Sequence, residues 1–234
     1  MSPFERRDGE IGLRKPLSGL ATFEPLPGTV ALLAVMIGSV TFDGVSVAPL
    51  WTGIAPDISR FLQDIGLAPQ RALELTFAIG LAAAILIVLG FYRLGVVGAR
   101  SDGGGFSADR LAGAFVHSLV PIALAYIAAH YLTLLLFPGQ ALAFLASDPL
   151  GDGADLFGTA GEQIDYGVIG ATATWYWQVG LVVAGHVAGL TLAHDRALGL
   201  YDKVRLAARS QYWMLAVMVG FTSLALWLLS QANA

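Results

Sequence analysis

Cysteine is absent from this chain of 234 residues, lysine occurs only at Lys15 and Lys203, and charge of either sign is scarce. The lack of cysteine excludes disulfides, thiolate metal sites, iron–sulfur clusters and a cysteine nucleophile. Charged residues make up 13% of the chain and hydrophobic residues 56%, whereas soluble domains are about 25% charged. This composition excludes a disordered chain and predicts an integral membrane protein whose partner is the lipid bilayer. A net charge of −4 gives no reason to expect a nucleic acid partner.

Long gaps between charged residues mark the candidate membrane spans. A charge at the bilayer centre costs about 2.5 to 3.5 kcal/mol on insertion scales, and about 20 residues of helix cross the hydrocarbon. The gaps predict an all-α, polytopic bundle over residues 28–234, behind a cytoplasmic leader at 1–27. We also expect a surface helix within 56–70 and a short interfacial or re-entrant piece at 138–147. The five predicted spans are 28–50, 74–93, 111–137, 168–194 and 211–230.

Basic residues are distributed unevenly among the predicted loops. Lys and Arg gather in the leader and in the second and fourth loops, whereas the third loop has none and carries several carboxylates. The positive-inside rule therefore predicts a cytoplasmic N-terminus and an external C-terminus. The leader has no apolar core of a secretory signal peptide, so the first span is expected to direct insertion. The odd number of spans and the prolines of the leader suggest that the leader is a loop between two halves of a longer protein.

Ionisable residues inside the predicted spans are the first candidates for a functional site, because such residues are rare in lipid. They are Asp43, His117, His130 and His186. Asp43 and His130 lie in the outer halves of their spans, and His117 and His186 lie in the inner halves. The depths predict an outer polar cluster of Asp43 with His130 and an inner one of His117 with His186. The alternative is structural: each histidine would only hydrogen-bond a backbone carbonyl or hydroxyl across helices.

The same residues could in principle hold a transition metal as cofactor. Imidazole and carboxylate suit zinc, copper or iron. His117 and His130 lie about 20 Å apart along one helix, however, which disfavours one four-ligand site. His186 and Asp43 are the metal-ligand candidates that remain. Two smaller sites, a proton relay and purely structural pairs also stay open.

Small residues and a proline predict how the third and fourth spans pack. Gly185 and Gly189 share a helix face with His186, and a small-xxx-small spacing lets a neighbouring helix approach closely. We therefore expect His186 to face protein. Pro121 cannot donate a hydrogen bond to the carbonyl of His117, so a kink is predicted there.

Two stretches resemble a known family. They are GTVALLAVMIGSVTFDG at 28–44 and AGHVAGLTLAHDRAL at 184–198. Both are similar to polytopic membrane proteins, common in actinobacteria, that are labelled fenitrothion hydrolase. The likeness runs through most of the chain and corresponds to the C-terminal half of those proteins. It implies a bacterial plasma membrane and organophosphorus ester hydrolysis. The matched candidates are Asp43, His186, His194 and Asp195.

Three functions remain open at this point. The first is a subunit or half of a membrane complex with a buried Asp/His polar site, packed against other membrane subunits or a second copy. The second is a transporter-like protein that moves a small solute, an ion or a proton. The third is a membrane-embedded, metal-dependent ester hydrolase, as the resemblance implies, so whether the chain is an enzyme is left open.

Overall fold

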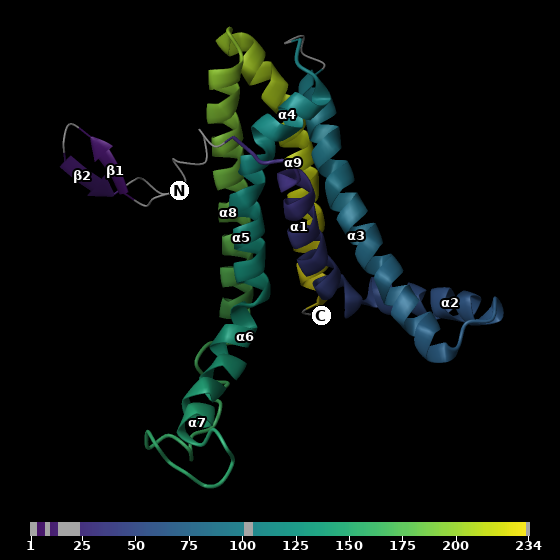
Figure 1. Cartoon of the computed structure of the whole chain (residues 1–234), viewed down its shortest axis with the longest axis vertical. Helices are drawn as coiled ribbons and strands as arrows, with labels where there is room; N and C mark the ends of the chain where they lie inside the picture. The colour runs from purple at the N-terminus through teal and green to yellow at the C-terminus, as the bar shows by residue number, and fades with distance from the viewer. Residues whose placement is uncertain (1–3, 8–9, 14–23, 101–104, 233–234) are drawn as a thin grey trace.

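The computed structural model describes residues 4–7, 10–13, 24–100 and 105–232, and helices dominate it (Figure 1). In the predicted leader, strands β1 (Phe4–Arg7) and β2 (Glu10–Leu13) form an antiparallel hairpin with Phe4 opposite Leu13. The remainder of the leader up to residue 23 lies outside the described residues. The helices are α1 (Thr29–Ser46), α2 (Pro49–Asp64), α3 (Pro69–Arg100), α4 (Ala108–Phe115), η1 (Val116–Ser118), α5 (Leu119–His130), α6 (Leu132–Leu136), η2 (Pro138–Gln140), α7 (Ala141–Ser147), α8 (Ala171–Leu200) and α9 (Val204–Ala232).

The all-α, multi-pass architecture is confirmed. Among the described residues, four helical stretches are long and apolar enough to cross a membrane, and they overlap with the first four predicted spans. These stretches are Thr29–Ser46, Pro69–Arg100, Ala108–His130 and Ala171–Leu200. The fifth predicted span, 211–230, lies within α9, which has 29 residues and packs against α3 and α8. Its membrane crossing stays a prediction.

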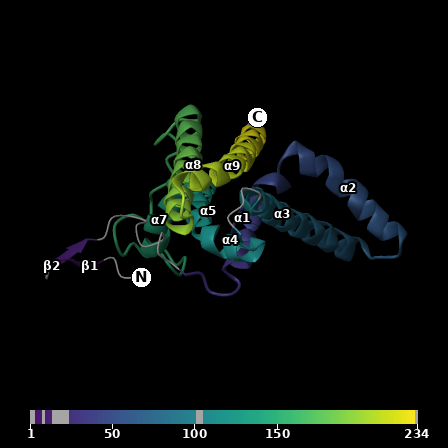
Figure 2. The same cartoon turned by 90° about the horizontal axis from the view of Figure 1, so that it is seen from above.

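The first predicted span is shorter than expected, because the helix ends at Ser46 instead of continuing to residue 50. Ala48 is extended, with ψ 154°, and Pro49 begins α2. A residue before proline is pushed out of the helical region, and proline is favoured in the first helical turn. The surface helix expected within 56–70 therefore starts at Pro49, and α2 extends to one side of the bundle (Figure 2).

The third predicted span is also interrupted. Instead of one helix over 111–137, it consists of α4, the short 3₁₀ turn η1, α5 and α6. The turn contains His117, whose carbonyl has no donor at Pro121. A second break follows His130 at Tyr131. The piece expected at 138–147 forms η2 and α7, which project beyond the bundle (Figure 1).

Helix α8 lies close against α5 because two glycines remove the side chains between them. A Cβ atom at Gly189 would stand 2.8 Å from the Ser118 carbonyl oxygen, and one at Gly185 would stand 3.0 Å from that of Pro121. Both distances are too short for an ordinary contact. The predicted packing glycines thus lie where the backbones of the two helices meet.

Two buried apolar clusters complete the bundle. One joins α3, α4, α8 and the start of α9 around Phe115 and Leu111. The other joins α1, α3, η1 and α5 around Ile37 and Ile122. Between them they tie α1, α3, α5, α8 and α9 each to at least two other helices.

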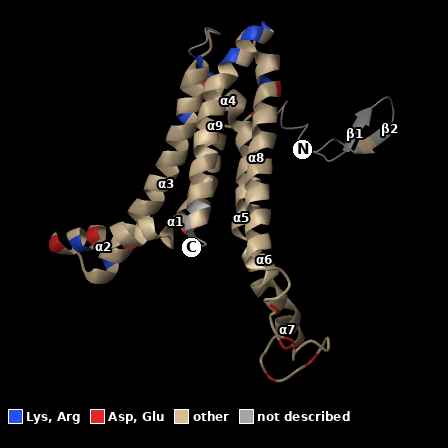
Figure 3. Ribbon diagram, turned by 180° about the vertical axis from the view of Figure 1, so that it is seen from behind, with Lys and Arg blue, Asp and Glu red and all other residues tan. Residues whose placement is uncertain are grey.

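Charge is distributed unevenly between the two ends of the bundle (Figure 3). Lys and Arg gather where α3 ends and where α8 leads into α9, whereas Asp and Glu are frequent on α2 and in the segment after α7. In that segment the hydroxyl of Ser147, and then the backbone N–H of Ala160, donate to Asp155 and hold the pKa of its carboxyl below the ordinary value. Hydrogen bonds around the segment therefore favour the ionised form of Asp155 at this acidic end.

We expect Gly189→Ala to destabilise the bundle by about 1 to 3 kcal/mol, because its methyl group would overlap the Ser118 carbonyl. Gly180→Ala on the same helix is the matched control, since no atom lies within 4 Å of the place that its Cβ would take. That control should be neutral or slightly stabilising. Thermal unfolding in detergent measures both, and equal melting temperatures would contradict the close approach.

The predicted orientation can be tested by labelling, because the chain has no cysteine of its own. A Glu162→Cys variant should react with a membrane-impermeant maleimide on intact cells. A Lys203→Cys variant should react only after permeabilisation, since Lys203 lies between α8 and α9, where the basic residues gather. The opposite pattern would show that the orientation is inverted.

Candidate functional site

A carboxylate and an imidazole meet at one end of the bundle. Asp43, in the last turn of α1, and His130, the last residue of α5, approach to 2.6 Å between Oδ2 and Nε2. The His130 side chain is 27% exposed and that of Asp43 is 61% exposed. The structure thus brings the two residues of the predicted outer cluster together, with the carboxylate still open to a ligand.

The pair lines a cleft of about 330 Å³ between α1, α5 and α8. Asp43 is the acidic residue of the lining, which contains neither Lys nor Arg. Valine and alanine side chains form the remaining walls. The polar lining residues are Thr41, Asp43, Tyr126, His130, Thr133 and Gln178.

Gln178 lines the cleft and holds a buried, unpaired acceptor. Its side chain is buried, and Nε2 donates to the Ala129 carbonyl at 3.1 Å, from α8 to α5. Because a carbonyl only accepts, this contact fixes the nitrogen of the amide and leaves Oε1 on the other side. Oε1 has no hydrogen-bond partner among the described residues. A buried acceptor without a partner is costly, so the site favours a donor there.

Tyr126 and Thr41 add two further oxygens. Thr41 donates its hydroxyl hydrogen to the Ile37 carbonyl at 2.8 Å. The hydroxyl of Tyr126 lines the same cleft. Its oxygen can accept a hydrogen bond.

The two inner histidines are buried but bond to backbone. Nδ1 of His186 lies 2.8 Å from the Val182 carbonyl, and Nε2 of His117 lies 3.4 Å from the Leu192 carbonyl. The His186 ring also lies beside Phe221. The His117 contact crosses from η1 to α8, as the structural alternative describes, whereas the His186 contact lies within α8. His194 and Asp195 are exposed near the end of α8.

The described residues give the predicted metal site no cluster of ligands. Within the described ranges, no three His, Asp or Glu side chains gather as a metal site would require. Asp43 has His130 as its partner, and His186 does not line the cleft. A metal held by His186 and Asp43 therefore stays a prediction.

Sequence reasoning did not single out Gln178, Tyr126 or Thr133 as site residues. A signal for two of them exists in the helical period, since Tyr126, His130 and Thr133 are spaced by four and three residues. Gln178 shares the α8 face that carries Gly185. The sequence could therefore have indicated these residues, because they are neutral polar residues on helix faces that also carry ionisable ones.

The pair should show a measurable coupling. We expect Asp43→Asn and His130→Gln to be less destabilising together than the sum of the single changes, by about 1 kcal/mol. Asp57→Asn with Arg60→Gln is the control cycle, because that pair on α2 is 3.3 Å apart and both side chains are about 70% exposed. Thermal unfolding in detergent measures both cycles, and a coupling no larger than in the control would rule out a strong contact.

Comparison with known proteins finds no match to this chain. No family model, no curated protein and no solved structure matches this chain. The resemblance to the fenitrothion hydrolase family, and the ester hydrolysis that it implies, stay predictions. The assignment of function therefore starts from the residues of the cleft.

Proposed function

We propose that this chain is a transporter-like integral membrane protein that binds a small polar solute or a proton at the Asp43–His130 pair. The observation that supports the proposal is the 2.6 Å contact of the two side chains on the wall of an open cleft. Both residues come from helical stretches long and apolar enough to cross a membrane. An ionisable pair at such a position marks substrate and proton pathways in membrane proteins.

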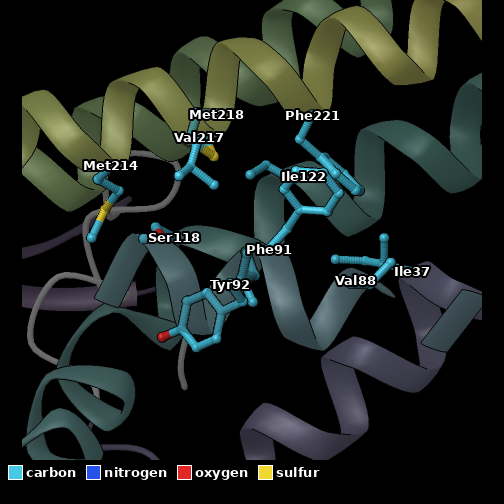
Figure 4. A pocket seen from close by; sticks show the side chains of 12 residues that line it. Ile37, Val88, Phe91, Tyr92, Ser118, Ile122, Met214, Val217, Met218 and Phe221 are labelled. Carbon is cyan, nitrogen blue, oxygen red and sulfur yellow. The ribbon is translucent and has the colours of Figure 1, made fainter. Parts of the chain in front are cut away.

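A layer of apolar side chains lies about one helical turn from the cleft, toward the middle of the bundle. Ile37, Ile122 and Phe221 each lie three or four residues from a cleft-lining residue of their own helix, and they surround an apolar cavity of about 50 Å³ (Figure 4). Met214 and Met218 of α9 line the same cavity. Methionine side chains are flexible and repack readily. In this proposal, α9 moves at this apolar layer when a solute passes beyond the cleft.

A proteoliposome assay tests the proposal. Purified protein is reconstituted with an internal pH-sensitive dye, and flux is followed under an imposed proton gradient. We expect Asp43→Asn to abolish the flux, because it removes the charge and the proton site. Asp57→Asn is the matched control, since this carboxylate lies on the exposed surface of α2. Undiminished flux in folded Asp43→Asn protein would refute the role of the pair.

A second candidate is a subunit of a membrane complex. It is supported by α2 and α7, which project from the bundle (Figure 1). On α2, the side chains of Leu50, Ile54 and Phe61 are exposed. Other membrane subunits or a second copy could cover them. Flux no greater than in empty vesicles would favour this candidate over transport.

A further inference from the structure

We infer that the cleft binds a small primary ammonium ion with an apolar body, such as an alkylammonium. The inference rests on the proposed function, because it names the class of solute that the Asp43–His130 cleft takes. Three features of the described residues support it: the sign of the charge, the excess of acceptors and the apolar walls.

The cleft carries a carboxylate. Oδ2 of Asp43 accepts from Nε2–H of His130, and more than half of the Asp43 side chain remains exposed. The other carboxylate oxygen, Oδ1, is left to accept from a ligand. The cleft lining has neither Lys nor Arg to compensate this charge. An anionic solute would be repelled there.

The free hydrogen-bonding groups are acceptors. Gln178 Oε1 is buried without a partner among the described residues, and the Tyr126 hydroxyl oxygen on the cleft wall can also accept. The second carboxylate oxygen of Asp43 makes a third acceptor. An –NH₃⁺ group has three donors and no acceptor, so its needs match this set. A bare metal ion would need a denser cluster of ligands than the described residues form.

The walls and the size suit an apolar body. Val40, Val45 and Val182 line the cleft beside Ala129 and Ala225. A volume of about 330 Å³ far exceeds an ammonium ion and falls at the lower end of small-molecule sites. The alkyl part of the ligand would contact these valines while the ammonium group reaches Asp43 and Gln178.

A single cysteine in the cysteine-free chain reports on the cleft. Thr133 lines the cleft and is close to cysteine in size, so Thr133→Cys is the reporter variant. The protein is held in nanodiscs, where both aqueous faces are accessible. Labelling rates are compared for cationic and anionic methanethiosulfonates of matched size. Thr191→Cys, on the exposed surface of the spanning helix α8, is the control for a thiol covered by lipid.

We expect the cationic reagent to label Thr133→Cys about tenfold faster than the anionic one, because the Asp43 carboxylate on the same cleft attracts the first and repels the second. Asp43→Asn in the same background should remove this preference. Butylammonium should slow labelling, whereas butanol, which lacks the charge, and tetramethylammonium, which lacks N–H donors, should protect less. Gln178→Leu should weaken the protection by butylammonium.

The outcomes separate the two proposals. Labelling by both reagents at equal rates, with no protection by butylammonium, would overturn the ammonium inference and leave an open cleft. Equal protection by butylammonium and tetramethylammonium would also overturn it, because the acceptors would then play no part. No labelling of Thr133→Cys by either reagent, as for Thr191→Cys, would show a closed cleft and refute the proposed function itself.

Discussion

The close approach of α8 to α5 is the constraint on which the rest of this structure depends. Gly185 and Gly189 let the α8 backbone lie against the carbonyls of Pro121 and Ser118. In lipid there is no hydrophobic force between helices, so such backbone contact and interhelical hydrogen bonds hold them together. The contact also brings Gln178 to the Ala129 carbonyl, next to His130. The wall of the cleft is thus a consequence of two missing side chains.

Helix α1 completes the cleft from the other side. It packs on α3, where a Cβ at Gly38 would lie 2.7 Å from the backbone of Ile85, and it reaches α5 through Asp43. A carboxylate at membrane depth is costly without a partner, and His130 provides one. The pair therefore joins two helices, and the exposed part of Asp43 keeps the carboxylate accessible from the cleft.

The positions of the membrane-spanning helices were predictable from the long gaps between charged residues. Gaps locate the helices because burying charge in lipid is costly, but they do not locate the ends within the gaps. Pro49 follows the end of the first helix, which stops before the charge-poor gap does, and the turn at His117 divides the third predicted span. The outer pair was predictable because Asp43 and His130 lie at the same depth. The backbone partners of His117 and His186 depend on side-chain rotation, and Gln178 carries no charge to draw attention.

The measurement that tests the account most directly is the distance between the His130 ring and the Asp43 carboxyl in a bilayer. Solid-state NMR of protein labelled with ¹⁵N-histidine and ¹³C-aspartate measures it as a dipolar coupling, with His130→Gln assigning the ring signal. A strong coupling to Nε2, as the 2.6 Å contact requires, would support the account. No coupling between the two groups in the folded protein would contradict it.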